Sequence, residues 1–268
     1  MTTDNFILQN WQLQQKVFTD NLIIIRRRPT KDAVHDLRVA VKRMRSYLRL
    51  KQKITGENWK EQFAGITLLF KSLGRLRDFD MSITLLRRYG DKEQPRLQLF
   101  QNYLNTNRNL TRRWAKEAAI KFEEQELNYF TEQFIASLAA FNKDELAGKT
   151  VEAARGNLSK TNQLARHFQK NVHEIRKLLK DVYYWMKICP EEQCNAVIKI
   201  KSLDKMLNNL GSWQDHFIFR EKLKYFRKKY LPKGNAELEG IKALEEKSAL
   251  EQDVLLAKAK SLWRDVVQ

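Results

Sequence analysis

Glycine and proline, the residues that most often mark tight turns, are scarce in this sequence. Its 268 residues include only 9 Gly and 4 Pro. A β-sandwich or β-barrel needs many tight turns, so this scarcity excludes those folds. Cysteine is rarer still, because Cys189 and Cys194 are the only two. Two cysteines make neither a disulfide framework nor a four-cysteine zinc site, and we expect two reduced thiols.

Long apolar runs are missing too. The longest strongly apolar run near the start covers residues 22–25, far short of the roughly 20 residues that span a membrane. Residues 1–11 are polar and carry no basic segment of the kind that begins a signal peptide. We therefore expect a cytoplasmic protein without a membrane span.

Acidic residues are too few to balance the basic ones. The chain has 50 Lys and Arg against 32 Asp and Glu, which gives a net charge of +18. Hydrophobic residues make up 43% of the chain, so it can bury a core and is not a disordered polyelectrolyte. The charge excess indicates a polyanionic partner: nucleic acid, an acidic membrane surface or a phosphate polymer.

Apolar residues recur at helical spacing along nearly the whole chain, which predicts an all-α protein. Pro29 ends a first helix over residues 4–27, and Thr30 caps a second helix that runs to residue 54. Further helices are expected over residues 59–89, from the break at Gly90 and Pro95 to 142, and over 151–169, 171–188, 191–230 and 236–267. The polar segment 142–150 is the predicted linker within a single domain, 1–268, of two bundle-like halves, 1–145 and 146–268.

The two halves share a pair of motifs. His35-Asp36-Leu37-Arg38 is similar to His173-Glu174-Ile175-Arg176, and Leu73-Gly74-Arg75-Leu76-Arg77-Asp78 is similar to Leu210-Gly211-Ser212-Trp213-Gln214-Asp215. His35 and Asp78 lie 43 residues apart in the first half, and His173 and Asp215 lie 42 residues apart in the second. Two motifs in the same order and at nearly the same spacing predict a duplicated helical unit.

A basic stripe runs beside the apolar face of the second expected helix. The stripe consists of His35, Arg38, Lys42, Arg45 and Arg49, each one residue after a member of the apolar seam Val34, Leu37, Val41, Met44 and Leu48. In the second half the stripe consists of His173, Arg176, Lys180, Tyr183 and Lys187, and Arg28 and Arg166 lie seven residues before the two histidines. A solvated helix face normally mixes both charges, but these stripes contain no acid. Their mutual repulsion would be relieved by a bound anion, and we predict that Arg28 and Arg166 contact the same anion.

The turn at Gly56 predicts which residues of its two helices lie level. In an antiparallel hairpin about Gly56, His35 faces Asp78, while Arg38 faces Arg75 and Lys42 faces Lys71. Lys71 and Arg75 are therefore also predicted to bind the anion. Gly74 would let the helices approach closely, and Asp78 could orient either His35 or Arg38. A structural hydrogen bond without a ligand role is the alternative. Asp215 and His173 are expected to repeat the arrangement.

These motifs closely resemble the CHAD family, in residues 34–45 and 73–80 and more faintly in 173–176 and 211–215. The resemblance covers essentially the whole chain. It implies two pseudo-symmetric antiparallel four-helix bundles with a basic groove or channel. It also implies binding of inorganic polyphosphate, often at polyphosphate granules. Carried over by position, the binding residues are His35, Arg38, Lys42, Arg45, Arg49, His173, Arg176, Lys180 and Lys187. Tyr183, Asp181 and Gln214 stand where the first half has Arg45, Arg43 and Arg77, so the first half is expected to bind more strongly.

An enzyme is the least favoured interpretation. Some members of the family carry a triphosphate-tunnel domain, but its Glu-x-Glu-x-Lys signature is absent here. His35-Asp36 is similar to the centre of an HD-type phosphohydrolase, yet no histidine precedes it and the two side chains point about 100° apart on a helix. We expect no catalytic site, no metal and no cofactor.

Nucleic-acid binding is the stronger alternative, because the net charge would attract any phosphate chain. The stripes, however, carry no aromatic platform beyond Tyr183. RNA or DNA could still touch the clusters Arg26, Arg27, Arg28 and Lys222, Lys224, Arg227, Lys228, Lys229. A scaffold for acidic proteins is a third reading. The sequence therefore predicts a polyphosphate-binding protein, with nucleic acid as a competing polyanion.

Overall fold

The computed structural model describes residues 5–61, 63–89, 97–194, 197–232 and 234–266, and every regular element in these ranges is an α-helix. The helices are α1 (Phe6–Arg27), α2 (Lys31–Thr55), α3 (Ala64–Tyr89), α4 (Gln98–Lys121), α5 (Glu124–Leu138), α6 (Lys143–Ala165), α7 (Phe168–Ile188), α8 (Glu191–Cys194), α9 (Ile200–Lys229) and α10 (Leu238–Val266). The predicted all-α class is therefore confirmed. None of these helices has an apolar stretch long enough to cross a membrane.

Local capping explains where the first helices begin and end. The Thr30 side chain accepts a hydrogen bond from the backbone N–H of Ala33, as expected for the N-cap of α2. Gly56 ends that helix with φ of 80°, a left-handed conformation that costs glycine nothing. The expected break at Gly90 and Pro95 lies outside the described residues.

Four sequence-based boundaries were wrong. The segment expected as a linker is the start of α6, where Asn142 and Glu145 form a capping box, so its polar residues belong to a helix N-terminus. The helix expected to reach residue 142 is interrupted at Phe122 and Glu123, which separate α4 from α5. The helix expected over 191–230 is divided into α8 and α9, and α3 begins at Ala64 rather than at residue 59.

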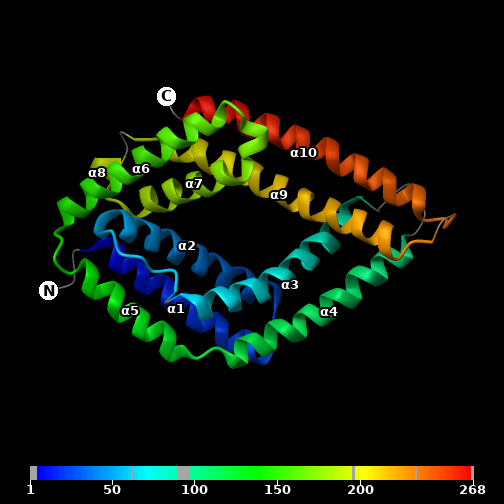
Figure 1. Ribbon diagram of the computed structural model, residues 1–268, viewed down its shortest axis with the longest axis horizontal. Coiled ribbons are helices and arrows are strands. Elements are labelled where there is room, and N and C mark those ends of the chain that lie inside the picture. Colours follow the sequence, from blue (N-terminus) through cyan, green and yellow to red (C-terminus); the bar gives the residue numbers. More distant parts are fainter. Residues whose placement is uncertain (1–4, 62, 90–96, 195–196, 233, 267–268) are drawn as a thin grey trace.

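Consecutive helices pack as pairs, α1 with α2, α3 with α4, α6 with α7 and α9 with α10. Figure 1 shows α1–α5 on one side of the molecule and α6–α10 on the other. Between the two sides, α2 contacts α7 and α3 contacts α9. The helices that carry the two predicted stripes, α2 and α7, are thus neighbours in the middle of the fold.

The hydrophobic core is shared between the halves. One buried cluster joins residues of the first half, such as Leu37, to residues of the second, such as Trp185. A smaller cluster joins Phe100 of α4 to Phe219 of α9. The indole of Trp185 also donates a buried hydrogen bond to the carbonyl oxygen of Ser46, at 2.9 Å. Because both cores cross from one half to the other, neither half is a separately packed bundle; the predicted duplication and the boundary at residue 145 stay predictions.

Candidate polyanion-binding site

Five cations from both halves gather where α2, α3 and α7 meet. They are Arg38 and Lys42 of α2, Arg77 of α3, and Arg176 and Lys180 of α7, and we call them the central cation cluster. All five are half-buried. Each of the other four acts on the charge of Lys42. The structure therefore brings together stripe residues that lie about 138 positions apart in the sequence.

Burial and mutual repulsion make this cluster unstable as a set of full charges. Burial, followed by Lys180 and the three arginines, lowers the pKa of Lys42 to about 6. Burial, with Arg176 as the next cause, lowers the pKa of Lys180 to about 8. Burial is also the main reason that the pKa of Arg38 falls to about 10. At neutral pH Lys42 is mostly uncharged, and a bound anion would favour its protonation.

Two carboxylates offset part of the charge. Asp215 of α9 accepts two hydrogen bonds from Arg77, at 2.6 and 3.1 Å, and so links the halves. Asp78 lies 3.6 Å from the same guanidinium. Burial raises the pKa of Asp78, even though Arg38, Arg77 and Lys222 lower it. Even with Lys42 uncharged, the other four basic groups outnumber the two carboxylates, so these two acids leave positive charge in the cluster.

The α3 helix fixes two of the three arginines of the α2 stripe. Arg38 donates a hydrogen bond to the carbonyl oxygen of Phe70 at 2.8 Å, and its guanidinium lies 4.3 Å from the centre of the Phe70 ring. Arg45 donates to the hydroxyl of Thr67 at 2.7 Å and lies 4.5 Å from the same ring. A Cβ at Gly74 would come within 2.7 Å of the Arg38 guanidinium. The space predicted at Gly74 thus exists, and the Arg38 side chain fills it.

The predicted contact between His35 and Asp78 does not form. His35 is exposed, and among the described residues Asp78 makes its ion pair with Arg77. The pairing of Arg38 with Gly74 and of Arg45 with Thr67 puts His35 level with Arg77, one residue before Asp78. One residue turns a helix by about 100°, which explains the difference. Of the two groups that Asp78 could orient, its charge acts on Arg38.

The second histidine also differs from the prediction. The ring of His173 meets the rings of Trp213 and Phe217 edge-on, at 5.2 and 5.6 Å, instead of contacting Asp215. Asp215 is occupied by Arg77. His173 therefore has an aromatic environment, whereas His35 contacts no ring among the described residues, and the two halves are not equivalent at this position.

Other predicted residues lie outside the cluster. Arg49 forms a two-point ion pair with Asp181, at 2.6 and 2.5 Å, and Asp181 is only 2% exposed, so this arginine is already neutralised. Lys71 and Arg75 are exposed on α3, where Arg75 lies 6.0 Å from the ring of Trp114. Lys187 is exposed at the end of α7, with its amine 5.3 Å from the ring of Tyr183.

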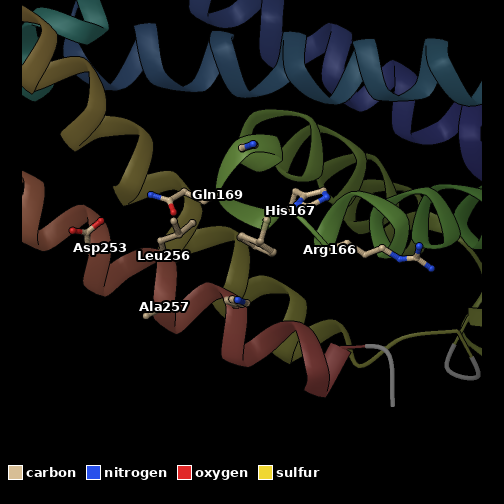
Figure 2. Close-up of a pocket in the computed structure, with 9 residues that line it drawn as sticks. Arg166, His167, Gln169, Asp253, Leu256 and Ala257 are labelled. Carbon is tan, nitrogen blue, oxygen red and sulfur yellow. The ribbon is translucent and has the colours of Figure 1, made fainter.

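Arg28 and Arg166 do not continue the two stripes, because neither lies on α2 or α7. Arg28 follows the end of α1 in an extended conformation, and its charge acts on Arg112 of α4. Arg166 lies in the turn between α6 and α7, where it lines a surface cavity of about 450 Å³ together with His167 and residues of α10 (Figure 2). A residue seven positions before each histidine would continue the stripe only if the helix extended that far. The chain instead turns before α2 and α7 begin, after Arg28 and Arg166.

Arg77 is the member of the cluster to which the sequence assigned no binding role. It stands in the glycine-containing motif of the first half, where the second half has Gln214. Its contact with Asp215 crosses between the halves, which no local pattern could show. Within the cluster, the Nε of Arg176 is buried and finds no partner among the described residues. No group of three or more His, Cys, Asp or Glu side chains in the described ranges is arranged to hold a metal ion.

Comparison with known proteins now places the chain in a family. Residues 11–224 match the CHAD domain. Similar solved structures include the CHAD domain from the plant Ricinus communis, with 14% identity, a TM-score of 0.70 and coverage of 97% of this chain and 90% of that one. PptA from Streptomyces chartreusis has 14% identity, a TM-score of 0.68 and coverage of 98% and 99%. No curated protein matches the sequence. Because the family match spans most of the sequence and the fold agrees along nearly all of it, the chain belongs to the CHAD domain family.

Proposed function

We propose that this protein binds inorganic polyphosphate and that the central cation cluster is the middle of its binding site. The supporting observation is the cluster itself: five half-buried basic side chains from two halves of the chain share two carboxylates among the described residues. Such an arrangement is costly in the free protein and becomes favourable when a polyanion occupies it. The resemblance of the stripe motifs to those of polyphosphate-binding CHAD proteins supports the same ligand.

The arrangement favours a polymer over a small phosphate. From His35 to Arg45 the α2 stripe covers about 15 Å at 1.5 Å per residue. Arg49 is left out of this length because Asp181 neutralises its charge. The α7 stripe lies beside it. A long phosphate chain could contact cations of both stripes at once, so its affinity should rise with chain length.

The immediate surroundings of the α2 arginines also favour phosphate over bases. Phe70 is the ring closest to them, and two guanidinium groups, those of Arg38 and Arg45, lie over it. A base would have to displace an arginine in order to stack there. Phosphate needs no aromatic surface, and guanidinium groups bind it with two parallel hydrogen bonds.

The function proposed is binding, without catalysis. Because the ligand is a storage polymer, we also propose a cytoplasmic protein that associates with polyphosphate granules.

The decisive titration compares long polyphosphate, pyrophosphate and single-stranded RNA at equal phosphate concentration and ionic strength. We expect long polyphosphate to bind most tightly and pyrophosphate weakly, with steep weakening in salt.

Matched variants link that affinity to the cluster. Lys42→Gln and Lys180→Gln should each weaken the binding of long polyphosphate about tenfold or more, the size expected for a half-buried charged contact. Lys53→Gln and Lys177→Gln change exposed lysines of the same two helices and should have little effect. Equal losses in all four variants, or displacement of polyphosphate by RNA at equal phosphate concentration, would show that the cluster is not a polyphosphate site.

A further inference from the structure

An aromatic cluster lies where α4 begins and α9 ends, at the end of the molecule on the right of Figure 1. Phe100 and Phe226 form its base, with ring centres 5.1 Å apart, and both are buried. Three tyrosines rest on this base. Tyr103 is 5.3 Å from Phe226 and 5.3 Å from Tyr230, and Tyr225 is 6.0 Å from Tyr230.

Two of the three tyrosines face solvent. Tyr225 is 50% exposed and Tyr230 is 55% exposed, although both belong to one connected group of rings. Each ring contacts at least two others, so the group is held in place before any ligand arrives. We call Tyr103, Tyr225 and Tyr230 the tyrosine platform.

A cavity opens beside the tyrosine platform. Its volume is about 440 Å³, and it is lined by Leu99, Asn102, Tyr103, Thr106, Asn107, Phe226 and Tyr230. None of these residues is charged. The rings and Leu99 offer apolar contact, while the amide of Asn102 and the hydroxyl of Thr106 can hydrogen-bond to the edge of a planar group.

Unpaired lysines border the platform. Lys228 and Lys229 follow Tyr225 by three and four residues on α9, so they lie on the same face of the helix. Both are exposed, and neither forms an ion pair with any residue in the described ranges. The neighbouring Lys224 and Arg227, in contrast, are paired with Glu221 and Glu245.

We propose that the tyrosine platform is a second binding site, for single-stranded nucleic acid. A base stacks on Tyr103 and Tyr230, and Lys228 and Lys229 contact phosphates on either side of it. Exposed rings next to unpaired cations are the combination by which proteins hold single strands without reading their sequence. Polyphosphate has no base and cannot use the rings, so this ligand differs from the one proposed for the central cation cluster.

A second copy of this chain is the simplest other occupant of the tyrosine platform, and charge repulsion disfavours it. A symmetric contact through the tyrosine platform would bring Lys228 and Lys229 of both copies together, and no acid lines the cavity to offset them. A single strand brings negative charge to the same place. The surface therefore complements a polyanion that carries flat apolar groups.

The test compares two oligonucleotides that differ only in their bases. Fluorescence anisotropy would measure the binding of a labelled 12-nucleotide single-stranded DNA and of a 12-nucleotide chain of abasic sites with the same phosphates. We expect the DNA to bind about tenfold more tightly, as stacking of a base on an aromatic ring provides. This ratio isolates the bases from every phosphate contact, so it does not depend on whether the central cation cluster binds polyphosphate.

Variants assign the ratio to the platform. Tyr230→Ala should bring the ratio close to one, and Tyr230→Phe should keep it because the ring remains. Tyr129→Ala removes a tyrosine that is 64% exposed on α5, outside the cluster, and should leave the ratio unchanged. Changing Lys228 and Lys229 to Gln should weaken both oligonucleotides alike and reduce the salt dependence by about one unit of slope per lysine.

Three results would overturn the proposal. The first is equal affinity of the wild-type protein for the two oligonucleotides. The second is a preference for bases that survives in Tyr230→Ala. The third is self-association, seen by sedimentation velocity, that Tyr230→Ala abolishes while the base preference is unaffected. Circular dichroism of each variant confirms folding, which the exposure of Tyr230 leads us to expect.

Discussion

On α2, two of the three arginines of the basic stripe are held by α3, whereas on α7 the corresponding cations have few fixed partners. Arg38 and Arg45 each combine a hydrogen bond to α3 with a contact to the ring of Phe70. In the described chain Arg176 and Lys180 form no hydrogen bond with another side chain, and the Nε of Arg176 is left without an acceptor. Each stripe contributes two residues to the central cation cluster, but Arg38 of α2 is held in place more firmly than the α7 side chains.

This difference gives a physical reason for expecting the first half to bind more strongly. A guanidinium that is already fixed loses little freedom when a phosphate arrives, while a free long side chain loses about 0.5–1.5 kcal/mol. Arginine has five donors, and the single hydrogen bond of Arg38 leaves most of them for a ligand. The α2 stripe is thus organised before binding, and the α7 stripe becomes organised on binding.

The largest expected effect comes from removing the fixed pair. Arg38→Gln with Arg45→Gln should weaken the binding of long polyphosphate about 100-fold, and Arg176→Gln with Lys187→Gln about tenfold. Each double variant removes two charges and one member of the central cation cluster, so net charge cannot explain a difference. Titrations at one ionic strength measure it, with thermal unfolding as the folding control. Equal losses would show that arginines held by α3 contribute no more to affinity than the α7 cations.

The two lysines of the cluster should respond to pH in different ranges. A bound phosphate favours the charged amine and raises its pKa, so binding takes up a proton and affinity rises as the pH falls. For Lys42 this uptake begins above its free pKa of about 6, and for Lys180 only above about 8. Near pH 7 we expect uptake of about one proton and up to about a tenfold gain in affinity per unit fall in pH.

Calorimetry in buffers of different ionisation enthalpy measures this uptake directly. Lys42→Gln should abolish the uptake near pH 7, and Lys180→Gln should leave most of it. Uptake that persists in Lys42→Gln would assign the proton to another group and contradict the lowered pKa of Lys42.

Stability should change in the direction opposite to binding. The folded-state pKa of Lys42 lies below its ordinary value of 10.5, so the unfolded chain binds more protons. The lysine therefore destabilises the free protein: fully below pH 6, and less as the pH rises from about 6 to 10.5. At pH 7, Lys42→Met should stabilise the free protein by about 1–3 kcal/mol, and Lys180→Met by less. Urea unfolding without polyphosphate measures both free energies of unfolding. If Lys42→Met were less stable than the wild-type protein, burial of the Lys42 amine would not be what destabilises the fold.

The helices were largely predictable because their signals are local. Apolar spacing identified the helical class, and the N-cap at Thr30 and the glycine at 56 fixed the ends of α2. The wrong prediction at residues 142–150 has a local cause as well, since the polar residues that predict a linker there include Asn142 and Glu145, which form a capping box.

The candidate site was predictable only in part. The stripes of α2 and α7 follow from helical spacing, but their meeting in one cluster depends on how the halves pack. The ion pairs of Arg77 with Asp215 and of Arg49 with Asp181 join residues more than 130 positions apart. The first ion pair holds Arg77 in the central cation cluster, and the second neutralises Arg49, a predicted binding residue. The hairpin at Gly56 shows how sensitive such geometry is, because an offset of one residue replaced Asp78 by Arg77 opposite His35.

The smallest expected effect tests the fixed position of Arg38 with two glycines. A Cβ at Gly74 would come within 2.7 Å of the Arg38 guanidinium, whereas a Cβ at Gly211, in the corresponding motif of α9, would meet nothing within 4 Å. Both glycines lie inside helices, so alanine should add about 0.5–1 kcal/mol of helix stability at either position.

Only Gly74→Ala should affect binding, because the guanidinium is the end of a flexible side chain and will move aside while the fold is kept. We expect polyphosphate affinity to fall about three- to fivefold, the part of the α2 advantage that comes from holding one side chain in place. Gly211→Ala should bind like the wild-type protein. If the two variants bound equally well, the order imposed on Arg38 by α3 would contribute nothing to affinity, and the two stripes would differ in charge alone.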